Sequence, residues 1–162
     1  MSQDHSGQPV PKITFRTRRD HEWVNLSSDD VFRGKTVVVF SLPGAFTPTC
    51  SSTHVPRYNQ LATEFKKHGV DEIICIAVND PFVLKAWGET TGATDAGIKM
   101  LGDADASFTK ALEADFTAPP LGLHERSNRY AALVEDGVVT VLNVDEPGVC
   151  DISTGERFVE AL

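Results

Sequence analysis

The chain has 162 residues, a length that suits one compact domain and is too short for two ordinary ones. Hydrophobic residues make up 41% and charged residues 23%, a balance that argues against wholesale disorder and against a membrane protein. The formal net charge of -8 repels phosphate groups, so it argues against nucleic acid or an anionic membrane as the main partner.

The N-terminal segment 1–11 is polar and contains no apolar core of the length that a signal peptide needs. We therefore expect a short flexible lead-in and a cytoplasmic protein. The runs 12–17 and 21–26 carry strand-forming residues on either side of a short polar connection. Two such runs predict an N-terminal β-hairpin.

Two apolar runs predict the centre of an α/β sheet. The run 36–42 is rich in β-branched residues and stops at a proline and a glycine, and the run 73–78 has the same apolar character. Continuous runs of this kind are typical of strands that are covered on both faces. Between them, apolar residues recur at helical spacing over 55–65, and basic residues with a glycine at 66–69 end the helix. This order predicts a parallel strand–helix–strand unit with a right-handed crossover.

Shorter elements follow in the second half of the chain. In chain order we expect a helix over 81–89, a strand over 98–101, a short helix around 108–112 and a hairpin formed by 130–134 and 138–144. The turn of that hairpin is Glu135-Asp136-Gly137, and the capping pattern at 153–156 predicts a final helix. Since there is no internal repeat and no linker, the sequence predicts a single α/β domain over 1–162.

The segment 43–50 lies between a predicted central strand and an amphipathic helix. Thr47 is a good N-cap and Pro48 is favoured at the first helical position, which places Cys50 at the third. A backbone N–H at that position has no acceptor inside the helix, so Cys50 lies in the positive end of the helix dipole. This field stabilises a thiolate and should lower the pKa of the thiol. The segment also follows the carboxyl end of a strand, where open α/β sheets bind ligands.

The pattern Pro43-x-x-x-Thr47-x-x-Cys50 resembles the active-site signature of peroxiredoxins. The longer string 42–58, LPGAFTPTCSSTHVPRY, resembles the atypical peroxiredoxin 5 (type II) subgroup, and the similarity extends to 69–73, 78–80 and 127–130. The resemblance implies a thioredoxin-like fold, with a central mixed β-sheet flanked by helices and an N-terminal β-hairpin extension. It also implies a thiol peroxidase without metal or organic prosthetic group. Some bacterial relatives carry a fused C-terminal glutaredoxin domain, which we do not expect here.

The resemblance assigns four site residues. It makes Cys50 the peroxidatic cysteine, gives Thr47 the hydroxyl that binds the peroxide, and has Pro43 shield the thiolate from water. Arg129 matches the family arginine whose guanidinium stabilises the thiolate and the polarised peroxide. The chemistry agrees, because negative charge develops on the departing oxygen and fixed donors nearby lower the barrier.

Two polar residues on the predicted helix are further candidates. His54 lies one helical turn after Cys50, and Arg57 lies a further turn along, so both are expected to line the same pocket. The alternative is that they are solvated side chains in the first turns of a helix, and the sequence leaves both interpretations open.

The three cysteines receive different interpretations. The sulfenic acid formed on Cys50 must be returned to a thiol by another thiol. Cys150 lies in a region that resembles the resolving-cysteine loop of animal-type members, and an intramolecular disulfide is the leading hypothesis. Alternatively, an external glutathione/glutaredoxin or thioredoxin thiol resolves Cys50. Cys75 falls inside an apolar strand and is expected to pack in the core.

The predicted function is therefore a thiol-dependent peroxidase that acts on hydrogen peroxide and alkyl hydroperoxides. The alternative from another class is a redox relay or chaperone-like module that uses Cys50 oxidation as a signal. A thiol-disulfide oxidoreductase is disfavoured because the chain has no Cys-x-x-Cys motif. The histidines and cysteines show no zinc-ligand spacing, so no metal site is expected. A homodimer is expected from the resemblance alone.

Overall fold

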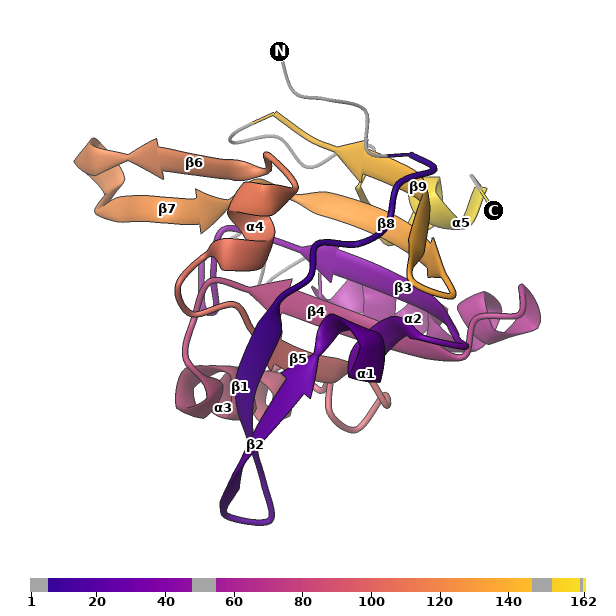
Figure 1. Cartoon of the computed structure of the whole chain (residues 1–162), viewed down its shortest axis with the longest axis horizontal. Coiled ribbons are helices and arrows are strands. Elements are labelled where there is room, and N and C mark those ends of the chain that lie inside the picture. Colours follow the sequence, from indigo (N-terminus) through magenta and orange to yellow (C-terminus); the bar gives the residue numbers. More distant parts are fainter. Residues whose placement is uncertain (1–5, 48–54, 147–152, 161) are drawn as a thin grey trace.

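The computed structural model of the chain describes residues 6–47, 55–146, 153–160 and 162 (Figure 1). Its centre is a five-stranded sheet in the order β5-β4-β3-β8-β9. Strands β3, β4 and β5 run parallel, whereas β8 is antiparallel to β3 and β9 is antiparallel to β8. The five strands are β3 (Thr36–Ser41), β4 (Glu72–Ala77), β5 (Lys99–Gly102), β8 (Tyr130–Glu135) and β9 (Val138–Val144). The predicted mixed sheet of a thioredoxin-like fold is confirmed.

Helices and two small antiparallel sheets complete the described part of the domain. The helices are α1 (Ser28–Phe32), α2 (Val55–Lys67), α3 (Pro81–Thr90), α4 (Ser107–Ala111) and α5 (Gly155–Glu160), with a 3-10 turn, η2 (Pro119–Leu121). The small sheets pair β1 (Thr14–Arg19) with β2 (Glu22–Ser27) and β6 (Asp115–Ala118) with β7 (Leu123–Ser127). The sequence does not predict α1, β6 or β7, whereas the other helices and strands agree closely with the predicted ones.

Both faces of the central sheet are covered, which explains the continuous apolar runs of β3 and β4. Phe40 of β3 points to the face covered by α2 and α5, where its ring stacks on that of Tyr58 with 4.0 Å between centroids. Its neighbour Val39 points to the opposite face and packs with the hairpin, α1 and α4. Cys75 of β4 is fully buried on the α2 face, so its predicted place in the core is confirmed.

The N-terminal hairpin is present, but its strands lie slightly further along the chain than predicted. Asp20 and His21 form the turn with positive φ angles of 49° and 67°, as a two-residue type I′ turn requires. Arg18 therefore belongs to β1, and its guanidinium lies over the rings of Trp23 and Phe82 at 5.4 and 5.1 Å. These cation–π contacts explain why a charged residue extends the strand instead of forming the turn.

Residues 7–10, within the segment 1–11 that was expected to be flexible, are hydrogen-bonded to β9 and the turn before it. The N–H of Gly7 donates to the carbonyl of Val139 at 2.6 Å, and the N–H of Val10 donates to Gly137 at 2.9 Å. Val139 in turn donates to the carbonyl of Gln8 at 2.8 Å. The physical reason is that β9 is the last strand of its sheet, and residues 7–10 satisfy backbone groups that its outer edge would leave unpaired. The buried side chain of Val10 anchors the segment.

The end of the chain is fixed to α2 by polar and close contacts. The hydroxyl of Tyr58 donates to the carbonyl of Ser153 at 2.6 Å, and the hydroxyl of Ser153 donates to the Asp145 carboxylate. A Cβ atom at Gly155 would lie 2.8 Å from Leu61, so α5 approaches α2 more closely than a larger residue would allow. None of the described helices is long and apolar enough to cross a membrane.

Candidate active site

Three segments meet at one end of the central sheet. The register between β3 and β8 places Ser41 opposite Tyr130, so the residues after β3 lie beside those before β8. Strand β4 runs parallel to β3 with Ser41 opposite Ile76, so the turn after β4 reaches the same end. The loop 42–47, the turn 78–80 and the segment 127–129 are thus brought together at the carboxyl ends of parallel strands, where such sheets bind ligands.

Two of the predicted site residues are buried at this end. Pro43 is buried, and only 7% of Arg129 is exposed. The carbonyl of Arg129 accepts a hydrogen bond from the N–H of Asp145 at 2.8 Å, which fixes the backbone that carries the guanidinium. The next residue, Tyr130, is fully buried, and this burial raises the pKa of its hydroxyl far above the ordinary value. A buried positive charge acts on its neighbours more strongly than one in water.

The loop that contains Thr47 adopts an unusual backbone. Gly44 has a φ of 152° and Phe46 a φ of 66°, and the second value is uncommon for a residue with a side chain. The hydroxyl of Thr47 donates to the carbonyl of Gly44 at 2.7 Å, and the N–H of Thr47 donates to the same oxygen at 3.3 Å. The loop therefore closes on itself immediately before the predicted start of the helix.

Two residues that the sequence analysis did not assign hold this loop from outside. Oδ1 of Asn79 accepts a hydrogen bond from the N–H of Ala45 at 2.9 Å, and Nη1 of Arg126 donates to the carbonyl of Pro43 at 3.4 Å. A Cβ atom at Gly44 would collide with the Arg126 guanidinium, so a larger residue there would require this guanidinium to move. The position of Asn79, directly after an apolar strand parallel to β3, is the sequence signal that could have identified it.

The remaining predicted site residues are not placed with the loop. Cys50, His54 and Cys150 lie outside the described residues, as does the predicted helix start at Pro48. Nη1 of Arg57 donates to Oε1 of Gln60 at 2.7 Å on the exposed side of α2. The roles of these residues stay predictions.

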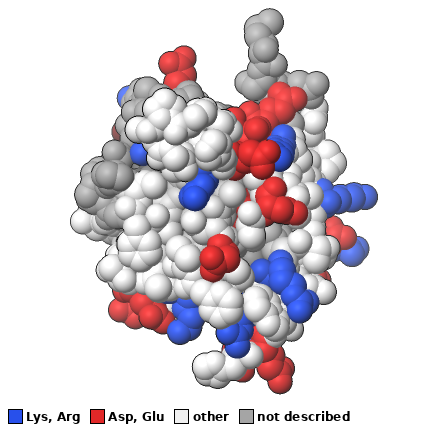
Figure 2. All heavy atoms as spheres, turned by 90° about the vertical axis from the view of Figure 1, so that its left-hand side faces the viewer, with Lys and Arg blue, Asp and Glu red and all other residues white. Residues whose placement is uncertain are grey.

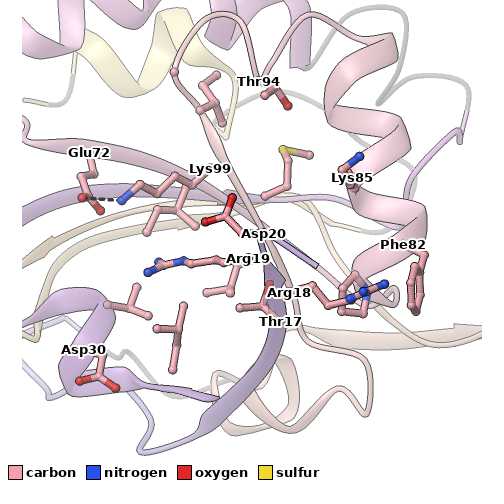
Figure 3. A pocket seen from close by; sticks show the side chains of 18 of the residues that line it. Thr17, Arg18, Arg19, Asp20, Asp30, Glu72, Phe82, Lys85, Thr94 and Lys99 are labelled. Atoms are coloured by element: carbon pink, nitrogen blue, oxygen red, sulfur yellow. Dashed lines mark hydrogen bonds and ion pairs between the residues drawn. The ribbon is translucent and has the colours of Figure 1, made fainter. Parts of the chain in front are cut away.

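A separate groove with a volume of about 950 Å³ lies between the N-terminal hairpin, α3 and β5. Arg19, Lys85 and Lys99 line it from these three elements (Figure 3). Burial raises the pKa of the Glu72 carboxyl in its wall, but the ammonium groups of Lys99 at 2.7 Å and Lys35 at 3.4 Å outweigh this and hold the pKa below its ordinary value. Pro43, Thr47, Arg57 and Arg129, the predicted site residues that the structure describes, do not line this groove. Among the described residues, no group of three or more histidine, cysteine, aspartate or glutamate side chains could hold a metal ion.

Comparisons with known proteins agree on one family. Residues 5–155 match the family described as Redoxin. The chain is 45% identical over 157 residues to peroxiredoxin-2B of Arabidopsis thaliana, covering 96% of each protein. It is 47% identical over 144 residues to the hybrid peroxiredoxin hyPrx5 of Haemophilus influenzae, covering 88% of this chain and 59% of that longer protein. The crystal structure of reduced Prx3 from Vibrio vulnificus in complex with hydrogen peroxide superposes with a TM-score of 0.91 at 44% identity, covering 98% of this chain and 99% of that one.

Proposed function

The chain belongs to the peroxiredoxins, a family of thiol peroxidases, and on this premise we propose that it reduces hydrogen peroxide and alkyl hydroperoxides with Cys50 as the attacking thiolate. The observation that carries the proposal is that Arg129 is buried and that the register between β3 and β8 sets its backbone beside the loop that contains Pro43 and Thr47. A fixed positive charge at this end of the sheet stabilises both a thiolate and the negative charge that develops on a peroxide oxygen.

The first half of the proposed cycle oxidises Cys50. The Cys50 sulfur attacks one oxygen of ROOH, an S–O bond forms, and the O–O bond breaks. The sulfur keeps the terminal O–H of ROOH, and the departing oxygen takes up a proton from water and leaves as ROH, so that the peroxide is reduced and Cys50 is oxidised to a sulfenic acid. Thr47 binds the peroxide, Arg129 stabilises the departing oxygen, and buried Pro43 limits the access of water. His54 and Arg57 are the candidates for completing the pocket.

The direct test is peroxide consumption by the purified protein with a thiol donor. We expect many turnovers per protein molecule, with thioredoxin or with glutathione and glutaredoxin as the reductant. No consumption by protein whose Cys50 is shown to be reduced would contradict the proposal. Oxidation that stops after one equivalent and passes to a captured partner would instead indicate the redox relay or chaperone-like module.

The second half of the cycle is proposed to use Cys150. Its thiol would attack the sulfenic sulfur of Cys50, which forms a disulfide and releases water. We expect Cys150→Ser to abolish the intramolecular disulfide and to reduce turnover with thioredoxin by more than about tenfold, while the first oxidation of Cys50 keeps its rate. Mass spectrometry of the peroxide-treated protein measures the disulfide. Unchanged turnover in this variant would show that an external thiol resolves Cys50.

A cytoplasmic homodimer is the proposed form of the protein. One face, viewed in Figure 2, carries few charged side chains over its left half. The loop, α3 and η2 expose large apolar side chains, with 54% of Phe46, 55% of Phe82 and 73% of Leu121 accessible. Contiguous apolar patches are typical of interfaces, and we propose that these side chains contribute to one. We expect analytical ultracentrifugation to give twice the mass of one chain. The variant Leu121→Glu places a charge on this surface, and we expect it to shift the equilibrium from dimer toward monomer. A monomer at all concentrations would contradict the proposal.

A further inference from the structure

The peptide group between Gly44 and Ala45 is hydrogen-bonded on both sides. Its N–H, from Ala45, donates to Oδ1 of Asn79 at 2.9 Å, and its carbonyl, from Gly44, accepts from the Thr47 hydroxyl at 2.7 Å. Because a peptide group is planar, its N–H and carbonyl cannot turn independently. Whatever fixes the direction of the Ala45 N–H therefore also fixes the carbonyl to which Thr47 donates.

We propose that Asn79 is a positioning residue for the reaction at Cys50, and that it acts through the Gly44–Ala45 peptide group to orient the hydroxyl of Thr47. The proposal rests on the proposed peroxidase function. It concerns a residue in the turn after β4, 34 positions along the chain from Ala45.

Asn79 is itself held firmly enough for this role. Its N–H donates to the carbonyl of Ala77 at 2.9 Å, at the end of β4. The next residue, Asp80, caps α3 by accepting from the N–H groups of Phe82 and Val83 at 2.8 and 3.0 Å. A Cβ atom at Gly102 would lie 2.6 Å from the Asn79 carbonyl, so β5 packs closely against the same turn. The turn that carries Asn79 is thus held in place by β4, α3 and β5.

The loop depends on such outside contacts. The positive φ of 66° at Phe46 is a costly conformation that persists only where the surroundings hold it. The contact from Arg126 to the Pro43 carbonyl is long at 3.4 Å, whereas the bond to Asn79 has an ordinary length of 2.9 Å. The atom that accepts must be the amide oxygen, because the backbone N–H can only donate. Asn79 is therefore the stronger of the two clamps.

The bond pattern decides which way Thr47 can interact with a substrate. A hydroxyl has one proton and two lone pairs, and the Thr47 proton is directed to the Gly44 carbonyl. The oxygen is left with lone pairs that accept a hydrogen bond, which suits the O–H of a hydroperoxide. If the peptide group turned, the Thr47 proton would lose its acceptor and the hydroxyl would rotate, so the peroxide would be bound in several orientations instead of one.

The experiment measures the rate constant of the pre-reduced protein with hydrogen peroxide in a single turnover. Rate constants are compared at the high-pH plateau of the pH–rate profile, where the thiol is fully ionised, so that a change in its pKa does not alter the comparison. We expect Asn79→Ala to be about tenfold slower, the effect of one hydrogen bond, and Asn79→Asp, which keeps an oxygen acceptor, to recover most of the rate. The step in which thiol reduces oxidised Cys50 should be unchanged.

A double-mutant cycle separates this role from a merely structural one. If Asn79 acts through the Thr47 hydroxyl, Asn79→Ala combined with Thr47→Val should be no slower than Thr47→Val alone. The matched control is Asn59→Ala, since Nδ2 of Asn59 also makes a 2.9 Å bond to a distant backbone group, the carbonyl of Thr91. Asn59 lies on α2 outside the loop, and this variant should keep the full rate.

Each outcome bears on one of the two proposals. If the unmodified protein does not react with peroxide, the proposed function is wrong. If it reacts and Asn79→Ala is equally fast, or if the losses of Asn79→Ala and Thr47→Val multiply, the positioning role of Asn79 is wrong. Should Asn79→Ala not fold, by circular dichroism, Asn79→Leu, which is similar in size to asparagine but has no acceptor atom, replaces it in both comparisons.

Discussion

The variant Cys50→Ser is expected to abolish peroxide turnover, with the turnover rate reduced by more than about a thousandfold. A serine hydroxyl is not ionised near neutral pH, and it does not form the sulfenic acid through which the catalytic cycle passes. Peroxide consumption measured with excess thiol donor gives the result. The loss should already be complete in a single turnover, because the first chemical step is the one that disappears.

The matched control is Cys75→Ala. Cys75 is fully buried in β4 and packs on the α2 face of the sheet, so its loss should lower the free energy of unfolding without changing the peroxidase rate of the folded protein. Urea unfolding and peroxide consumption separate the two effects. Turnover retained in Cys50→Ser, or lost in folded Cys75→Ala, would mean that the wrong thiol has been assigned.

The second large effect is expected at Arg129. Arg129→Ala should reduce the second-order rate constant with hydrogen peroxide by about a hundredfold to a thousandfold, the range found when one preorganised donor to a developing negative charge is removed. The pH–rate profile should also move to higher pH, because the thiolate loses a nearby cation. Arg129→Lys keeps the charge but not the planar array of donors, so we expect an intermediate rate. Stopped-flow mixing of reduced protein with peroxide, repeated over a range of pH, measures the second-order rate constant and the pH–rate profile of each variant.

The control for charge alone is Arg16→Ala. This arginine lies on the exposed N-terminal hairpin, where its guanidinium is 5.2 Å from the Trp23 ring centre and its Nη1 donates to Asn25 at 2.8 Å. Losing it also removes one positive charge, yet the rate should stay within about twofold of the unmodified protein, since exposed charges act weakly at a distance in water. A comparable loss of rate in both variants would show that net charge, and not the place of Arg129, matters.

The central sheet could be predicted because its strands carry strong local signals. β3 and β4 are buried on both faces, so burial alone required continuous apolar runs at 36–42 and 73–78. The hairpin of β8 and β9 was marked by the Asp136-Gly137 turn, where both residues have positive φ angles. In these segments the residue pattern and the tertiary environment favour the same secondary structure.

The elements that escaped prediction lack such a signal. Strands β6 and β7 contain only one buried residue, Ser127, and pair with each other, and each is too short for an apolar alternation to be recognised. Helix α1 is only five residues long, and its capping box of Ser27 and Asp30 precedes too short an apolar pattern to be recognised. The pairing of residues 7–10 with β9 depends on a free sheet edge, a property of the assembled sheet that segment 7–10 does not encode.

The sequence by itself determined the class of fold, the family, and the thiol chemistry proposed for Cys50, because each of these depends on residues close together in the chain. The tertiary structure decided which residues lie around the loop after β3. The register that sets Ser41 opposite Tyr130 brings Arg129 beside the loop after β3, and the parallel neighbour β4 delivers Asn79 to the Ala45 N–H. These partners are separated by tens of residues, so no local pattern could join them. Strand pairing, which is driven by burial of the whole sheet, is the physical event that makes them one site.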